Sequence, residues 1–182
     1  MPESPFPVRS VAVPAQSRIA NFFKHTCLVD AYEIRLPAGT SADPEALARF
    51  VLSQQAPWMA GLMRARDALV AGFGLKTSRM LTDPRAASAN RRIGIFRIYE
   101  THPNEIVLGE DDKHLDFRLS VMRQTQGSVP ADEATLTVST TVHCHNALGR
   151  GYILLIAPFH RRIVQAMLRR AARAGWPQRA SV

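Results

Sequence analysis

The chain has 182 residues, of which 46% are hydrophobic, and it carries a formal net charge of +8 at pH 7. This size and apolar content suit one domain with a substantial core rather than two domains. The N-terminus holds prolines and an acidic residue in place of the basic and apolar regions of a signal peptide. The longest apolar run, residues 152–159, is far below the roughly 20 residues of a membrane-spanning helix. We therefore expect a soluble, cytoplasmic protein without a membrane span.

The two cysteines favour the same location. Cys27 and Cys144 are far apart in the sequence and belong to no paired motif. The simplest interpretation is a pair of reduced thiols in a cytoplasm.

The basic excess is concentrated at the C-terminal end. Residues 149–182 hold seven arginines and no acidic residue, whereas the rest of the chain is nearly balanced. A basic, amphipathic terminal helix suits nucleic acid, an anionic membrane or an acidic protein surface. A solvated helix face is the default interpretation, and nucleic acid is not the expected partner because no aromatic residue interleaves with these arginines before Trp176.

The first part of the chain predicts an arm, a strand and two helices. Residues 1–17 are proline-rich and without a period, which predicts an extended arm. Residues 28–36 alternate as a strand does, with Tyr32, Ile34 and Leu36 on one face. A short helix is expected from Asp43 and Pro44, an N-cap followed by proline. A second helix is expected to begin near Pro57 and to end at residues 72–74.

The second part predicts strands and a long final helix. Residues 76–91 have no period and predict a loop, and residues 92–100 predict a strand that is apolar on both faces. In the strand predicted for residues 114–123, one face carries Leu115, Phe117, Leu119 and Val121, and the other carries His114, Asp116, Arg118 and Ser120. Residues 134–145 predict the clearest strand, with His143 and His145 on its polar face.

The final helix is predicted to follow Gly149. Its expected apolar face consists of Tyr152, Leu155, Ile156, Phe159, Ile163, Ala166 and Met167. Pro158 lies on its polar side and is expected either to kink the helix or to restart it. An antiparallel sheet with one dry face needs a cover, which this helix can supply. The sequence therefore predicts an α+β fold, with an arm over residues 1–17, one domain over residues 18–176 and a tail over residues 177–182.

This order of elements resembles the helix-grip fold of the START-like (SRPBCC, polyketide-cyclase-like) superfamily. In that fold a curved antiparallel sheet wraps around a long C-terminal helix, with two short helices after the first strand. Several segments resemble, more specifically, a bacterial family of unknown function within it: Trp58–Leu75, Ile93–Phe96, Gly109–Val121 and Asn146–His160. The resemblance implies a cavity between sheet and C-terminal helix, which often holds an apolar ligand, and it carries over no catalytic residue.

Some relatives place such a domain behind an NAD(P)-binding domain. This chain has no strand–glycine-loop–helix unit ahead of it, so a nucleotide-binding partner would be a separate protein. We predict no resident cofactor.

Candidate site residues fall into two groups. The expected lining of an apolar pocket is Trp58, Met59, Met63, Phe117, Tyr152, Phe159 and His160, each of which has an ordinary core position as its alternative. The expected polar cluster is His114, Asp116, Arg118 and Arg150. Two of its members, His114 and Asp116, form with His143 and His145 the ligand types of a zinc site, but the wet face of a sheet is the favoured interpretation and no metal is predicted. The charged run of Glu110, Asp111, Asp112 and Lys113 predicts a solvated turn paired with Arg91, Arg92 or Arg97.

Three functions are compatible with these residues. The leading hypothesis is a domain that binds a small apolar molecule between sheet and helix. The alternatives are a cyclase or hydratase that uses His160, Tyr152 or Asp116 in acid–base catalysis, and an interaction module that docks through the arginine-rich helix. No motif for a catalytic nucleophile is visible.

Overall fold

The computed structural model describes residues 7–61, 64, 91–125 and 134–179. Its elements are β1 (Arg9–Val11), β2 (Leu28–Leu36), α1 (Pro44–Ser53), β3 (Arg92–Ile93), β4 (Phe96–Thr101), β5 (Glu105–Asp111), β6 (Leu115–Thr125), β7 (Ala134–Cys144) and α5 (Ala147–Ala174). Residues 57–61 are also helical, as expected for the start of a second helix, whereas most of that helix and the loop predicted after it lie outside the described residues.

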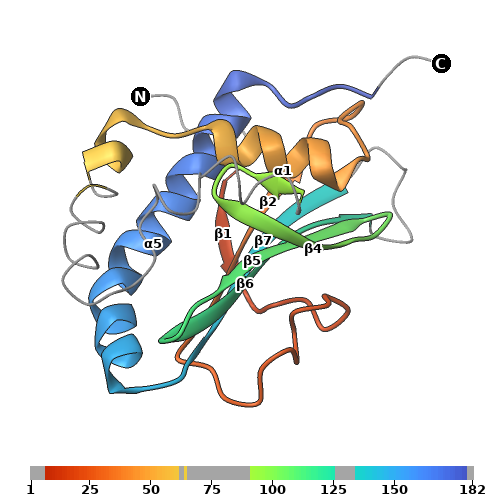
Figure 1. Cartoon of the computed structure of the whole chain (residues 1–182). Helices are drawn as coiled ribbons and strands as arrows, with labels where there is room; N and C mark the ends of the chain where they lie inside the picture. Colours follow the sequence, from red (N-terminus) through yellow and green to blue (C-terminus); the bar gives the residue numbers. More distant parts are fainter. Residues whose placement is uncertain (1–6, 62–63, 65–90, 126–133, 180–182) are drawn as a thin grey trace.

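The strands form one antiparallel sheet in the order β1-β2-β7-β6-β5-β4-β3. The helices α1 and α5 lie on one side of this curved sheet, and α5 runs diagonally across it (Figure 1). The predicted α+β fold, an open antiparallel sheet with a long C-terminal helix, is confirmed.

Strands β6 and β7 follow the alternation predicted from their sequences. Leu119 of β6 pairs with Thr140 of β7, and Val121 pairs with Val138, so that paired side chains share a face. The apolar face of this hairpin is turned toward the helices, where Leu119, Val121 and Val138 enter the main hydrophobic cluster. The period of two in the sequence therefore identified the buried face of both strands.

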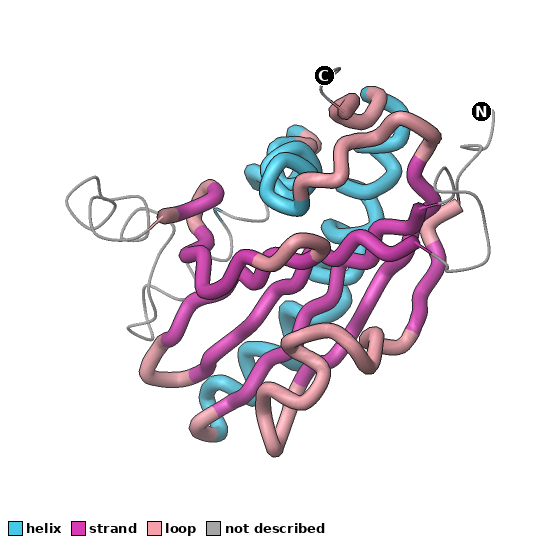
Figure 2. Tube along the Cα trace, turned by 90° about the vertical axis from the view of Figure 1, so that its right-hand side faces the viewer, coloured by secondary structure: helices cyan, strands magenta, loops and turns pink. Residues whose placement is uncertain are grey.

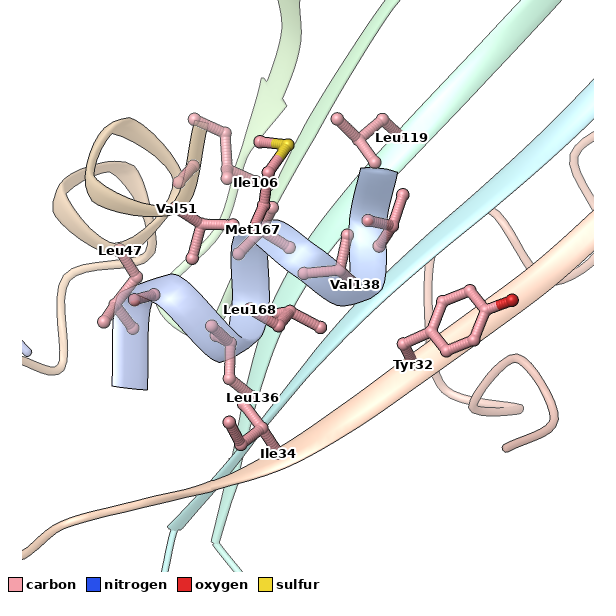
Figure 3. Packing of buried hydrophobic residues seen from close by; sticks show 14 of the residues in the cluster. Tyr32, Ile34, Leu47, Val51, Ile106, Leu119, Leu136, Val138, Met167 and Leu168 are labelled. Atoms are coloured by element: carbon pink, nitrogen blue, oxygen red, sulfur yellow. The ribbon is translucent and has the colours of Figure 1, made fainter. Parts of the chain in front are cut away.

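The main hydrophobic cluster lies between the sheet and the helices α1 and α5. Figure 3 shows Leu168 of α5 beside Leu136 and Val138 of the sheet, with Val51 of α1 close by. Leu168 is fully buried. A smaller cluster beyond it consists of Leu28, Leu115, Val142, Cys144 and Ile153, with Phe117, Tyr152 and Ala157 packed against it.

The helix α5 is rotated relative to the prediction. The residues that it buries are Gly149, Ile153, Val164, Met167, Leu168 and Ala171, whereas Leu155 and Phe159 of the expected apolar face are 51% and 40% exposed. The sequence could not fix the rotation because residues 152–159 are apolar on almost every side. Pro158 lies inside the helix, which continues through it without a break.

Two strand assignments differ from the prediction. The strand predicted for residues 92–100 is instead a hairpin, in which Ile93 pairs with Phe96 across a two-residue turn. The turn is possible because Gly94 has φ +58°, a backbone conformation that residues with a Cβ atom rarely adopt. Glu110 and Asp111, predicted to belong to a turn, end strand β5. Glu110 nevertheless has the expected kind of partner, since Arg92 donates to it at 2.7 Å.

The polar face of the sheet is not the wet face that the sequence predicted. Figure 1 shows the segment after β1 crossing below the sheet, on the side away from α5; we call residues 12–27 the N-terminal cover. Ser17 and Ile19 of the cover are buried. Polar residues of the sheet on this side are buried as well, namely Glu105, Arg118, Ser120, Thr137, Ser139 and Thr141. The chain ahead of β2 thus supplies a second layer that the alternation of the strands could not reveal.

The expectation of two reduced thiols is wrong for this structure. Cys27 and Cys144 form a disulfide, with Cα atoms 6.1 Å apart and a sequence separation of 117. The pairing of Leu28 with Val142 brings the start of β2 against the end of β7, and both cysteines lie there. A rule based on cysteine spacing does not detect this pair because the fold, not the local sequence, makes them neighbours. Within the described ranges, no helix is long and apolar enough to cross a membrane.

Replacing Leu168 with alanine should lower the free energy of unfolding by about 2–5 kcal/mol, because a fully buried leucine leaves a cavity in the main cluster. The matched control is Leu154→Ala, since Leu154 lies on the same helix and is 78% exposed. This control should change stability by less than about 0.5 kcal/mol. Urea unfolding followed by circular dichroism measures both. Equal losses in the two variants would show that α5 is rotated differently from the orientation described above.

Candidate functional site

A band of polar side chains separates the two hydrophobic clusters between the sheet and α5. It consists of Asp30 from β2, Thr140 from β7, and His160 and Arg161 from α5; we call it the Asp30 seam. On the helix, Ile153 belongs to the smaller cluster and Val164 to the main cluster. The seam therefore interrupts an interface that is otherwise apolar.

Asp30 is the centre of the seam. The Nε2 atom of His160 lies 3.4 Å from Oδ1 of Asp30, and Nε of Arg161 lies 3.6 Å from Oδ2. The side chain of Asp30 is 8% exposed and that of His160 is 25% exposed, whereas Arg161 reaches the surface with 51% exposed. Two elements, β2 and α5, thus bring a carboxylate, an imidazole and a guanidinium together at the edge of the core.

Several polar atoms of the seam are buried without hydrogen bonds. Among the residues that the structure describes, neither oxygen of Asp30 accepts a hydrogen bond, and Nε2 of His160 and Oγ1 of Thr140 make none, although His160 and Asp30 are close enough for an ion pair. A buried polar group left unpaired costs about 1–3 kcal/mol. Groups of this kind in native structures are usually satisfied by ordered water or by a bound molecule.

The strand pattern explains why Asp30 is buried. Strand β2 alternates, so that Leu28, Asp30 and Tyr32 share the face turned toward α5. The register pairs Asp30 with Thr140, which puts both polar side chains at the same position on that face. His160 follows Ile153 by seven residues, two helical turns, and so returns to the buried side of α5.

The predicted pocket residues divide into several environments. Met59 is buried in the main cluster, whereas Trp58 is 46% exposed and Phe159 is 40% exposed. Phe117 and Tyr152 pack against the smaller cluster, next to the seam. Met63 lies outside the described residues. The structure therefore brings Phe117, Tyr152 and His160 to the same interface, and not Phe159.

Arg118 of the predicted polar cluster lies on the opposite face of the sheet. Arg118 is buried and its Nη1 donates to Oδ1 of Asp111 at 2.7 Å. The guanidinium carbon is 3.8 Å from the centre of the Tyr99 ring and 4.7 Å from that of Phe22. Such stacking stabilises a cation in place of water. Arg118 thus has a structural environment made by the sheet and the N-terminal cover.

The other members of that predicted cluster lie at the start of β6 and in the first turn of α5. Asp116 contacts His145 at 3.1 Å. His114 hydrogen-bonds Asn146, whose own side chain accepts from Gly149 N and caps α5. Arg150 is exposed. In the described part of the chain, no group of three or more His, Cys, Asp or Glu residues could hold a metal ion.

Electrostatics around Arg118 shift two pKa values. Burial, reinforced by the hydrogen bond that its hydroxyl donates to Asp111, raises the pKa of Tyr99 to about 12. Burial acts to raise the pKa of Asp111 too, but the hydrogen bonds from Arg118 and Tyr99 and the nearby arginine charges outweigh it, so the pKa of Asp111 is lowered. The Tyr99–Asp111–Arg118 group is therefore a neutral phenol, a carboxylate and a cation at neutral pH.

A cavity of about 620 Å³ opens on the same side of the sheet as the N-terminal cover. It is lined by Gln16, Ser17, Arg18, Asn21, Phe22, His102, Pro103, Asn104, Glu105 and Met122. Half of this lining belongs to the cover. The cavity is distinct from the sheet–α5 interface where the sequence predicted a ligand.

Sequence reasoning missed Asp30, Thr140 and Glu105. A signal for the first was present, since the alternation of residues 28–36 puts a carboxylate on the face of Tyr32 and Ile34. Thr140 gave a weaker signal because threonine is common in strands. No local pattern marks Glu105, since its burial depends on a turn of the cover far away in the sequence.

The lowered pKa of Asp111 predicts a pH-dependent contribution to stability. The folded state binds this proton more weakly than the unfolded state, so the contribution is present above the unfolded pKa of about 4 and is lost as the pH falls through the lowered folded pKa. The stability difference between the wild type and Asp111→Asn should therefore shrink as the pH falls below about 4. Urea unfolding at a series of pH values measures it. A difference that stays constant over this range would contradict the assignment.

The comparisons with known proteins give a family without a function. Residues 22–167 match a family described as protein of unknown function (DUF2867). No curated protein and no solved structure matches the chain. The matched residues include β2, the hairpin β6–β7 and most of α5, and therefore every residue of the Asp30 seam. The chain belongs to this family of proteins of unknown function.

Proposed function

We propose that this chain is a binding domain for a small molecule, held between the sheet and α5 at the Asp30 seam. The observation that supports the proposal best is the Asp30 carboxylate, which is 8% exposed and accepts no hydrogen bond from the described residues. Binding sites tolerate unpaired buried polar groups because the ligand supplies the missing partners.

The groups of the seam define the polar end of the ligand. A carboxylate accepts hydrogen bonds, and the hydroxyl of Thr140 both donates and accepts. We therefore expect the ligand to present a hydroxyl or amino group to Asp30, with a second polar atom within reach of Thr140 or His160. A purely apolar molecule would leave the carboxylate without a hydrogen bond.

The smaller hydrophobic cluster defines the rest of the ligand. Phe117 and Tyr152 pack beside it and are both partly exposed. Aromatic and aliphatic walls with a few polar groups are typical of small-molecule sites. The expected ligand is therefore a mainly apolar molecule with one polar end.

Acid–base catalysis at the same place is the second candidate function. The carboxylate of Asp30 lies 3.4 Å from the imidazole of His160, and a carboxylate next to a histidine can orient its ring and stabilise its charged form. An enzyme of the cyclase or hydratase kind would use His160 to move a proton of the bound molecule. A ligand that is recovered chemically unchanged after incubation favours binding alone, whereas a changed mass favours catalysis.

Native and denaturing mass spectrometry of freshly purified protein tests ligand binding directly. We expect a non-covalent mass in the native spectrum that is lost on denaturation. For quantitative comparison, the protein is titrated with N-phenyl-1-naphthylamine, an apolar fluorescent probe with one N–H donor. Asp30→Asn should weaken binding of this probe at least tenfold, about 1.4 kcal/mol. Glu33→Gln is the matched control, since Glu33 lies on the same strand and faces the other side of the sheet. Equal probe affinities in the wild type and both variants, together with a native spectrum that contains no ligand mass, would refute the proposal.

A stability measurement separates a binding role of Asp30 from a structural one. Asp30→Val should leave the free energy of unfolding of the ligand-free protein unchanged or raise it by about 1–3 kcal/mol, because a buried carboxylate that accepts no hydrogen bond is replaced by an apolar side chain suited to a strand. Urea unfolding of both proteins, freed of ligand, measures the difference. A loss of more than about 3 kcal/mol would instead identify the Asp30–His160 contact as a stabilising ion pair.

A further inference from the structure

We infer that the Cys27–Cys144 disulfide is a redox-sensitive latch that holds the second half of the N-terminal cover, residues 20–27, on the polar face of the sheet. Reduction by a dithiol releases this half from Arg118 and His143 and opens one wall of the cavity over Glu105. The first half of the cover stays in place. The disulfide itself packs with the smaller hydrophobic cluster, whereas the segment that it holds covers the face opposite the Asp30 seam. The inference does not depend on the proposed function.

The first half of the cover has a strong anchor of its own. Ser17 donates to Oε1 of Glu105 at 2.6 Å, and the backbone N–H of Arg18 donates to both carboxylate oxygens. Glu105 also accepts from Ser120 of β6 at 2.6 Å. Hydrogen bonds to a buried carboxylate are among the stronger ones in proteins. This anchor contains no sulfur and is unaffected by reduction.

The second half of the cover has weaker contacts. Phe22 is 44% exposed and lies against the Arg118 guanidinium. Phe23 stacks on His143 with the ring centres 5.7 Å apart, and a ring nitrogen of His143 lies 2.6 Å from the carbonyl oxygen of His25. Lys24 is exposed, as are its neighbours His25 and Thr26. The disulfide is the covalent link at the end of this lightly held segment.

The reduction is an ordinary thiol–disulfide exchange. A thiolate of the dithiol attacks the Sγ atom of Cys27, which is half-buried, and Cys144, which is buried, leaves as a thiolate. The second thiol of the reductant then attacks the mixed disulfide and releases Cys27. The protein gains two electrons and two protons as two thiols, and the reductant becomes a disulfide.

Release changes the cavity because the cover supplies part of its wall. Asn21 and Phe22 line the cavity and belong to the released half, whereas Ser17 and Arg18 remain with the anchor at Glu105. Phe22 also lies against Arg118, so the same movement exposes a guanidinium that is 5% exposed in the disulfide form. The oxidised protein therefore presents a walled cavity, and the reduced protein presents an open one with Arg118 exposed beside it.

Limited proteolysis with a lysine-specific protease tests the latch in the whole protein. The chain has lysines at positions 24, 76 and 113, so cleavage after Lys24 gives a unique short N-terminal fragment. Cleavage at this site should be at least tenfold faster in protein reduced with dithiothreitol than in oxidised protein. Hydrogen exchange should increase over residues 20–27 after reduction, including the amide of Cys27, which bonds Val142 in the disulfide form. The amides of β5 and β6 should keep their protection.

The Cys27→Ser/Cys144→Ser variant should be cleaved as fast as the reduced wild type, with or without dithiothreitol. If this variant does not fold, reduced wild-type protein alkylated with iodoacetamide replaces it. Equal cleavage of the oxidised and reduced wild type would overturn the inference. Loss of protection throughout the sheet after reduction would overturn it too, because the disulfide would then be a staple of the whole fold and not a latch on one segment.

Discussion

The register between β2 and β7 is the constraint on which the other features depend. It pairs Leu28 with Val142 and Asp30 with Thr140. The same alignment buries the carboxylate under α5 and brings Cys27 beside Cys144. Because side chains alternate along a strand, a slip by one residue would turn Asp30 to the opposite face and put Val29 under the helix. One set of backbone hydrogen bonds thus determines both the seam and the disulfide.

The two faces of the sheet are buried in different ways. One face packs against α1 and α5 through apolar side chains, with the Asp30 seam as its polar interruption. The other face is rich in buried polar residues, and a segment without regular secondary structure covers it (Figure 2). Its charges are paired, as with Glu105 and Ser17 or Arg118 and Asp111. On the helix side, the Asp30 carboxylate lies 3.4 Å from His160 and 3.6 Å from Arg161 but accepts no hydrogen bond from the described residues.

The sequence predicted those features that depend on local periodicity. The strands β6 and β7, their buried faces and the long final helix all follow from alternation or helical spacing. The rotation of α5 did not follow, because residues 152–159 offer apolar side chains in most directions. Of the seam, His160 was recognised at the edge of the helix, but its partner Asp30 lies on a strand 130 positions earlier in the printed sequence. The cover and the disulfide likewise depend on contacts between residues far apart in the sequence. Such contacts produce no periodic pattern in the sequence.

The disulfide also has a consequence for the order of events during synthesis. Cys27 precedes β2 and Cys144 ends β7, so strands β2 to β7 all lie between the two cysteines in the sequence. A nascent chain that has not yet extended past β7 contains only one of the two thiols and cannot form the bond. Correct closure therefore requires that the last strand has been made and has inserted between β2 and β6. The presence of the disulfide in a molecule therefore indicates that β7 had already been added to the sheet.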